Sequence, residues 1–167
     1  MGGILGNQII TIKNYTLQHV IDSMNFLLDK ASHSPEVRQH AIQITGYSED
    51  KIYPIYSWVK KNLRYVSDPQ GIKGSIELFI SPVKMVEWYN KGISLGGDCD
   101  DHALLLTGLY KSIGLKSNIV IVDVEGKGYD HAYSQVWSDK LNMFIAVDTV
   151  SKYPLGWEIS NYGKIVI

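Results

Sequence analysis

The sequence predicts an α+β domain in which helices pack against one face of an antiparallel sheet. Five helices are expected between residues 16 and 113, some from apolar residues at helical spacing and others from capping and proline signals at their ends. From residue 117 onward the spacing changes to a period of two, and turn residues separate three short apolar segments. A chain of 167 residues with 45% hydrophobic content can bury a sizeable core without a disulfide or a structural metal. We therefore expect residues 1–167 to form a single domain.

The first part of the chain is predicted to be mainly helical. After a strand-like run at residues 8–12, helices are expected over residues 16–30 and 34–45, and the second of them ends at a glycine. Ser48 is the predicted start of a third helix, whose apolar positions form one stripe. Pro54 has no backbone N–H and clashes with a preceding helical turn, so it favours a later start for that helix.

An extended piece and a glycine-containing loop are predicted before the two remaining helices. The extended piece covers residues 64–66, and the loop covers residues 68–75. Helices are expected at residues 81–92 and 99–113, and a glycine suited to a C-terminal cap lies at the end of each. The second of these helices has apolar residues around most of its circumference, which is typical of a helix covered on more than one side.

The last third of the chain is predicted to form the sheet. Strands are expected at residues 117–124, 129–138 and 141–148, and the connections between them are short. Short connections place sequential strands side by side, so these three should form an antiparallel meander. Residues 164–167 are predicted to add a strand at an edge of that sheet.

The only cysteine, Cys99, lies at the predicted start of the last helix, two residues after the pair Gly96 and Gly97. Unpaired N–H groups and the positive end of the helix dipole favour a thiolate at such a position. The neighbouring aspartates oppose this effect, so the expected thiolate depends mainly on a protonated His131. A single cysteine is otherwise most often an inert core residue. Its place at the helix start, away from the leucine-rich stripe, favours a nucleophile.

A base and a carboxylate follow the cysteine in the sequence. His131 lies in an alternating segment beside the small residue Ala132, and Asp148 comes directly after four apolar residues. A carboxylate buried there needs a hydrogen-bond donor, and the Nδ1–H group of His131 is the expected one. The alternative for His131 is a structural histidine within a strand. The set of Cys99, His131 and Asp148 fits a nucleophile, its base and a group that orients the base.

Three sequence blocks carry a resemblance to a known family. They are GGDCDDHALLLTGLYKSIGL at residues 96–115, DHAYSQVW at residues 130–137 and FIAVDT at residues 144–149. In this order they resemble the transglutaminase-like superfamily of papain-type cysteine enzymes, and the similarity extends upstream to about Ile52. One position departs from the family pattern, since residues 148–150 read Asp-Thr-Val where the family has Asp-Pro-Thr.

The resemblance implies a papain/transglutaminase-like fold, with residues 1–50 as an N-terminal helical extension and residues 52–150 as the family core. It also implies that Cys99, His131 and Asp148 are the catalytic triad of an enzyme that acts on amide bonds through a thioester intermediate. Hydrolysis by a peptidase or amidase and amine transfer by a transglutaminase both occur in the family. Hydrolysis is the expected activity, because water is always present as an acceptor, and amine transfer is the alternative. A non-catalytic assembly or binding module, for example in a virus or prophage, is the alternative outside enzyme chemistry.

The aspartates beside the cysteine are interpreted as structural. With Asp98 as the N-cap, Asp101 occupies the third helical position, and the two form an acidic version of the capping box. The backbone N–H of Cys99 is then a candidate oxyanion-hole donor. Trp88 is the suggested side-chain donor for the second position of that hole.

The other histidines and the acidic cluster are assigned no catalytic role. His102, one turn after the cysteine, is expected to be buried or at the rim of the site, with a backbone or carboxylate partner. Three histidines are expected at the surface: His19, His33 and His40. The cluster contains no Cys-x-x-Cys pair and no calcium-loop pattern, so neither a metal nor a cofactor is predicted.

The overall charge points to no charged partner. The formal net charge is −1, and no basic stripe for nucleic acid is present. No apolar run reaches transmembrane length, and the first residues lack a signal-peptide pattern. We therefore expect no nucleic-acid or membrane partner and a location in the cytoplasm or in a virion. The resemblance implies a protein or peptide amide as substrate, while the oligomeric state is left open.

Overall fold

The computed structural model describes residues 4–5, 9–68 and 76–167. The helices of this part are α1 (Leu17–Ser32), α2 (Pro35–Thr45), α3 (Ile52–Asn62), α4 (Pro82–Asn90) and α5 (Cys99–Ser112). The strands are β1 (Ile4–Leu5), β2 (Ile9–Lys13), β3 (Leu63–Tyr65), β4 (Ile76–Ile80), β5 (Leu95–Gly97), β6 (Ser117–Asp123), β7 (His131–Ser138), β8 (Met143–Val147) and β9 (Gly163–Val166).

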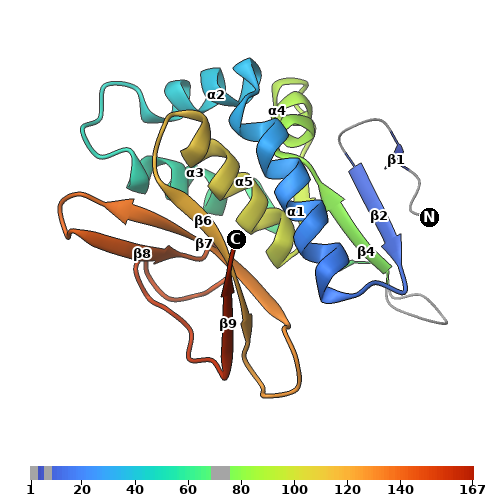
Figure 1. The fold of residues 1–167 in the computed structure, drawn as a ribbon. Coiled ribbons are helices and arrows are strands. Elements are labelled where there is room, and N and C mark those ends of the chain that lie inside the picture. The colour runs from blue at the N-terminus through green and yellow to red at the C-terminus, as the bar shows by residue number, and fades with distance from the viewer. Residues whose placement is uncertain (1–3, 6–8, 69–75) are drawn as a thin grey trace.

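The helices and the largest sheet form two layers, as expected for an α+β protein. The sheet has the strand order β8-β7-β6-β9, and α5 packs on it with the other helices around α5 (Figure 1). A smaller sheet, β1-β2-β4, lies on the far side of α1 from the main sheet (Figure 1). A third, two-stranded sheet pairs β3 with β5 in parallel. The predicted fold class is therefore confirmed.

The main sheet has the predicted antiparallel connections. β6 pairs with β7, so that Val122 lies opposite His131, and β7 pairs with β8, so that Ser134 lies opposite Val147. The C-terminal strand β9 pairs with β6 at the edge of the sheet. The register brings the beginning of β7 close to the residue that follows β8, and it thereby places His131 near Asp148.

Helix α5 is the centre of the core. Its four leucines at positions 104, 105, 106 and 109 are fully buried, and they face different neighbours. One core cluster joins α5 to α2, α3 and α4, and a second joins it to α1, β4 and β6. Gly108 allows Pro82 and Ala31 to pack closely against α5, because a Cβ there would lie 2.9 Å from a side-chain carbon of Pro82 and 3.0 Å from Ala31. In the described part of the chain, no helix is both long enough and apolar enough to cross a membrane.

The structure differs from the sequence-based expectation at several boundaries. The third helix begins at Ile52 and not at Ser48, because the Asp50 carboxylate accepts from the N–H groups of Ile52 and Tyr53 and ends the preceding turn. Pro54 consequently lies in the first turn, where its missing N–H costs nothing. Strands β4 and β5 were not predicted. Gln8 and the loop residues 69–75 lie outside the described residues.

Candidate active site

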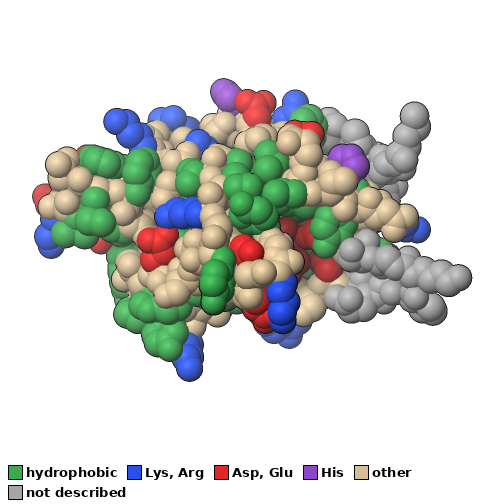
Figure 2. Space-filling view, turned by 60° about the horizontal axis from the view of Figure 1, so that its bottom comes forward, with side chains coloured by type: hydrophobic (Ala, Val, Ile, Leu, Met, Phe, Trp, Pro, Cys, Tyr) green, Lys and Arg blue, Asp and Glu red, His purple; other side chains and the backbone are tan. Residues whose placement is uncertain are grey.

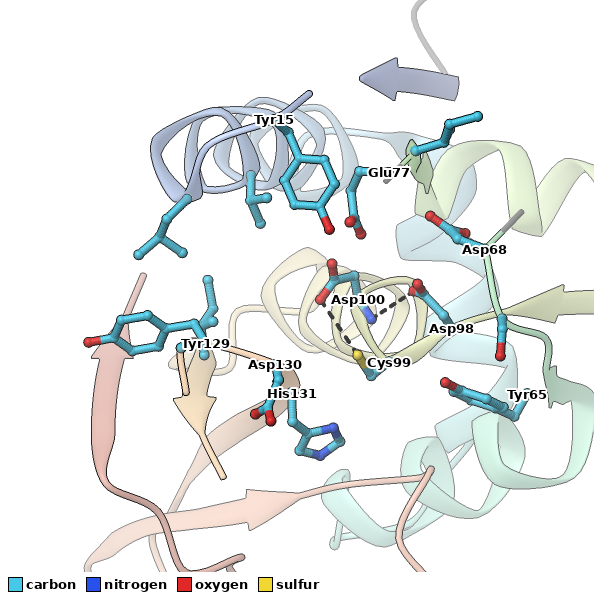
Figure 3. Close-up of a pocket in the computed structure, with 16 residues that line it drawn as sticks. Tyr15, Tyr65, Asp68, Glu77, Asp98, Cys99, Asp100, Tyr129, Asp130 and His131 are labelled. Carbon is cyan, nitrogen blue, oxygen red and sulfur yellow. Dashed lines mark hydrogen bonds between the residues drawn. The ribbon is translucent and has the colours of Figure 1, made fainter. Parts of the chain in front are cut away.

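Cys99 is the first residue of α5 and faces a pocket of about 540 Å³ (Figure 3). The pocket lies where the start of α5 meets the start of β7, the beginning of α1 and strand β4. It is lined by Tyr15, Leu17, Val20, Tyr65, Ser67, Asp68, Ile76, Glu77, Asp98, Cys99, Asp100, Ile121, Gly128, Tyr129, Asp130 and His131. The cysteine and the histidine predicted to react together therefore line the same pocket, five of whose lining residues are carboxylates.

A pair of aspartates fixes the start of the nucleophile helix. Asp98 is the N-cap, and its Oδ1 accepts from the N–H groups of Asp100 at 3.0 Å and Asp101 at 3.4 Å. Asp101 completes the capping box, since its Oδ2 accepts from the Asp98 N–H at 3.4 Å. This return contact requires Gly97, because a Cβ there would lie 2.5 Å from the side chain of Asp101.

Asp101 also connects the helix start to the neighbouring strand. Its Oδ1 accepts from the backbone N–H of Ile80 at 2.7 Å. This bond holds β4 against α5 and brings Glu77 of the same strand to the pocket. Asp68 reaches the same place by accepting from the Leu78 N–H at 2.6 Å. Glu77 and Asp68 are pocket residues that sequence reasoning missed, and the sequence holds no signal for them because tertiary contacts place both.

His131 and Asp148 form a directly hydrogen-bonded pair. The Nε2 atom of His131 lies 2.8 Å from Oδ2 of Asp148, and both side chains are largely buried. The other carboxylate oxygen, Oδ1, accepts from the N–H groups of Val150 at 2.9 Å and Ser151 at 3.1 Å. The expectation that Nδ1 would bond the carboxylate was wrong, because Nε2 is the ring nitrogen that lies within hydrogen-bond distance of Asp148.

The Asp148 carboxylate stays ionised in this environment. Burial acts to raise the pKa of Asp148, but the hydrogen bond and charge of His131 and the two backbone donors outweigh it, so the pKa is lowered. A carboxylate that accepts from Nε2 fixes the Nε2–H tautomer of a neutral imidazole. The Nδ1 lone pair of His131 is then available to accept a proton.

The thiol of Cys99 has a different environment. Its Sγ lies 3.8 Å from Oδ1 of Asp100, and no hydrogen bond joins it to His131 in the described structure (Figure 3). Burial, followed by the charges of Asp100 and Asp98, raises the pKa of the Cys99 thiol, and only the backbone N–H of Ala132 notably opposes them. The expectation of a lowered thiol pKa was wrong, because the acidic neighbours and burial outweigh the helix terminus.

The acidic side chains around the thiol also perturb one another. Burial, and then the charges of Asp68 and Glu77, raise the pKa of Asp98 to about 7. Burial and the charge of Asp98 raise the pKa values of Asp100 and Asp101 well above the ordinary range. Acidic side chains are also visible near the middle of the surface shown in Figure 2. This part of the site is therefore partly protonated near neutral pH.

Three of these carboxylates are close enough to share a cation. One oxygen each from Asp68, Glu77 and Asp98 lies within 4.8 Å of the others. Oxygen ligands of this kind suit a hard divalent cation. No second feature of the described residues points to an ion, so the cluster by itself assigns none.

The remaining candidate residues lie outside the pocket lining. His102 is 3% exposed, and its Nδ1 lies 2.8 Å from Oγ1 of Thr149, so the expected backbone or carboxylate partner is in fact a hydroxyl. Trp88 lies in α4 against the core, with the Lys84 ammonium over its ring, and its position does not support a role as an oxyanion donor. The other proposed oxyanion donor is the backbone N–H of Cys99. Because Cys99 is the first helical residue, no carbonyl of a preceding helical turn accepts from this N–H.

His40 corrects one of the surface assignments. His19 and His33 are exposed as expected, but His40 is only 5% exposed and contacts the rings of Trp58 and Tyr89. Its position one helical turn after Val37 is the sequence signal that could have indicated burial. Burial lowers the pKa of His40 and so disfavours the charged form of its ring.

Comparisons with known proteins agree with this fold. A model of the transglutaminase-like superfamily matches residues 36–149. A search of curated protein sequences gives no match. The structure resembles a proposed cysteine protease from Cytophaga hutchinsonii, with a TM-score of 0.55 and 15% identity over 93% of this chain and 53% of that chain.

Two further solved structures were compared. A proposed protease from Parabacteroides distasonis ATCC 8503 has a TM-score of 0.54 and 15% identity over 78% of this chain and 26% of that chain. Calcium-bound LapG from Legionella pneumophila has a TM-score of 0.40 and 17% identity over 82% of this chain and 67% of that chain. The chain thus spans about half of the Cytophaga structure and about a quarter of the Parabacteroides structure.

At these identities the structural likeness concerns the fold alone, whereas the superfamily model concerns the sequence itself. That model covers more than half of the chain and includes Cys99, His131 and Asp148. The resemblance found in the three sequence blocks is therefore confirmed. The chain belongs to the transglutaminase-like superfamily.

Proposed function

We propose that this protein is a cysteine-dependent acyl-transfer enzyme that hydrolyses amide bonds in a protein or peptide substrate. The observation that carries the proposal is the hydrogen-bonded pair of His131 and Asp148, which lies at the pocket into which Cys99 opens from a helix N-terminus. A nucleophile and a base in one pocket, with a carboxylate hydrogen-bonded to the base, are the groups that thioester chemistry requires. The coarser statement, that the fold is shared with proposed cysteine proteases, supports it.

The reaction begins with proton transfer between the two sides of the pocket. This step requires the Cys99 side chain to turn from Asp100 toward Nδ1 of His131, which then takes the thiol proton. The sulfur then attacks the carbonyl carbon of the substrate amide and forms a C–S bond. The N–H of Cys99 is the donor assigned to the resulting oxyanion.

The intermediate collapses by breaking the C–N bond. Imidazolium at His131 gives its proton to the departing nitrogen, so an amine leaves and a thioester remains on Cys99. Asp148 stabilises the imidazolium through Oδ2 while it exists. Water then attacks the thioester, with His131 again as base, and releases a carboxylic acid and the free thiol.

Amine transfer is the second candidate, and the charge of the pocket favours it. The lining includes five carboxylates and neither lysine nor arginine among the described residues. Such a surface concentrates protonated amines, and carboxyl groups with raised pKa values, such as Asp98, can accept the proton that an attacking amine must lose. The acceptor would then be a primary amine in place of water.

A non-catalytic module is the third candidate, favoured by the neutral resting thiol and by its hydrogen bond to Asp100.

Intact-mass analysis with p-nitrophenyl acetate distinguishes the three candidates. We expect acetylation of native protein at Cys99, loss of the adduct in Cys99→Ala, slow acetylation in His131→Ala, and decay of the wild-type adduct in buffer. Faster decay with added dansylcadaverine, with acetyl transfer to it, would favour amine transfer. Absence of acetylation in the native protein would favour the non-catalytic module.

A further inference from the structure

His102 is buried beside the catalytic groups, and among the described residues only one of its ring nitrogens has a hydrogen-bond partner. Its side chain is 3% exposed, Nδ1 bonds Oγ1 of Thr149 at 2.8 Å, and Nε2 is buried with no partner in the described part of the chain. An unpaired polar atom in a core costs free energy, and an apolar ring of similar size would avoid that cost. An apolar ring would, however, lack the hydrogen bond to Thr149, which is the interaction that the buried imidazole provides.

His102 is held neutral and kept out of the pocket. Burial lowers the pKa of His102 to about 4, although the charge of Asp148 opposes this shift. The residue is absent from the pocket lining, and its Nδ1 is already engaged. It cannot therefore replace His131 as the base for Cys99, and its contact with Thr149 persists unchanged across neutral pH.

The bond joins the helix of the nucleophile to the turn that holds the carboxylate. His102 lies one turn after Cys99 on α5, and Thr149 directly follows Asp148. Asp148 in turn bonds His131 through Oδ2 and its own turn through Oδ1. A chain of short contacts thus runs from α5 through Thr149 and Asp148 to the base. Both Thr149 and Asp148 are buried, at 7% and 8% exposure, so water does not compete for these bonds.

On the basis of the proposed function, we propose that His102 and Thr149 are positioning residues, which fix the Asp148 carboxylate relative to the nucleophile helix. The bond from imidazole to hydroxyl holds the turn at residues 148–150, where this chain lacks a proline. With Asp148 fixed, His131 keeps its proton on Nε2 and its lone pair on Nδ1. A small displacement of the turn would change the distribution of the two tautomers and slow acylation.

The test combines acylation kinetics with a spectroscopic readout of His131. Thr149→Val removes the hydroxyl at constant shape, and His102→Phe removes both nitrogens at similar size. We expect each to lower the rate of Cys99 acylation by p-nitrophenyl acetate about 10- to 100-fold, the range seen for misplaced catalytic groups. The ¹⁵N shifts of His131 should show that Nε2–H is no longer the dominant tautomer. Thr149→Ser keeps the hydroxyl and should restore both readouts.

A matched control removes another buried hydroxyl between α5 and the sheet. Thr107 Oγ1 donates to Ser134 Oγ at 2.8 Å, and neither hydroxyl is among the hydrogen-bond partners of Asp148 in the described structure. Thr107→Val should lower the melting temperature and leave the acylation rate and the His131 tautomer at wild-type values. The double variant of His102→Phe and Thr149→Val should lose no more activity than either single variant, because both break one contact.

Three results would overturn the proposal: wild-type tautomer populations in Thr149→Val, equal losses in Thr149→Ser and Thr149→Val, or multiplicative losses in the double variant. Failure of the proposed function gives a different pattern. In that case the wild-type protein would not acylate at all, yet the His131 tautomer would still respond to Thr149→Val and not to Thr107→Val. The spectroscopic measurement on Cys99→Ala protein, which needs no reaction, separates the two failures.

Discussion

The electrostatic environments on the two sides of the pocket have opposite effects on ionisation. On the sheet side, His131 and Asp148 satisfy each other at 2.8 Å, and two backbone donors hold the carboxylate in place. On the helix side, burial and neighbouring acids oppose ionisation of Cys99. The base is thus organised before substrate binds, whereas the nucleophile is neutral at rest. The comparison teaches that a cysteine at a helix start is not necessarily a thiolate, because nearby charges can outweigh the helix dipole.

Asp148→Asn should produce the largest effect, because it breaks the sheet side directly. The amide oxygen can still accept from Val150 and Ser151, so the turn and the melting temperature should be nearly unchanged. The amide nitrogen, however, would donate where Oδ2 accepted, which forces His131 into the tautomer with the proton on Nδ1. We expect acylation of Cys99 to slow by roughly 10⁴-fold. A loss below tenfold, measured by intact mass, would mean that Asp148 does not orient the base.

Asp100→Asn should favour ionisation of Cys99 and so reduce the electrostatic difference between the helix side and the sheet side. The variant removes the charge that most strongly opposes the thiolate after burial, while Oδ1 can still accept from Sγ. A decrease of one pKa unit raises the thiolate fraction about tenfold, so iodoacetamide should react about tenfold faster at an alkaline pH at which Asp100 is ionised. Asp130→Asn removes another pocket carboxylate, one that is not among the groups that raise the thiol pKa, and it serves as the matched control. An equal acceleration in both variants would contradict the assigned role of Asp100.

Asp98 tests whether the acidic helix start is structural. Asp98→Ala removes the N-cap acceptor and should lower the free energy of unfolding by about 0.5 to 2 kcal/mol in urea denaturation. Asp98→Asn keeps an acceptor at the N-cap and should be much closer to wild type. Both should leave the His131 tautomer unchanged. Loss of the Nε2–H tautomer without loss of stability would instead place Asp98 with the catalytic carboxylate.

The smallest effect concerns stability between pH 6.5 and 8. An unfolded aspartate is fully ionised there, but Asp98, with a folded pKa of about 7, still binds protons in the folded state. The folded state therefore binds more protons than the unfolded state, and stability must fall as pH rises through this window. His40 and His102, whose pKa values are lowered, lose their stabilising contribution only as the pH falls below about 6.5.

Urea denaturation in EDTA at several pH values between 6.5 and 8 measures this decline. Asp98→Asn keeps the cap but cannot ionise, so its stability should depend less on pH than that of the wild type. Stability that rises with pH in the wild type, or identical slopes in the two proteins, would contradict the raised pKa of Asp98.

The sequence predicted those features that depend on neighbouring residues. The start of α5 at Cys99, the capping box of Asp98 and Asp101, and the antiparallel meander all follow from local spacing or turn chemistry. The family of the chain was also recognisable, because its three blocks preserve the order of Cys99, His131 and Asp148. These features depend on residues close together in the sequence or on the order of its segments, and both can be read from the sequence directly.

The sequence did not predict features that depend on distant contacts. Thr149 lies 47 residues after His102, and nothing local indicates that their side chains meet. The thiol pKa was mispredicted for the same reason, since β4 brings Glu77 to the pocket and the depth of burial is set by the whole fold. His40 was placed at the surface because Trp58 and Tyr89, which enclose it, come from other helices.

The pH profile of Cys99 alkylation in the native protein tests the central claim most directly. The claim is that the thiol is neutral at rest and is activated only by proton transfer to His131 during attack. Iodoacetamide should modify Cys99 without denaturant, at neutral pH more slowly than it modifies free cysteine, with a rate that rises into the alkaline range. A rate that exceeds that of free cysteine at pH 7 and is already constant between pH 6 and 8 would show a resting thiolate and contradict the account.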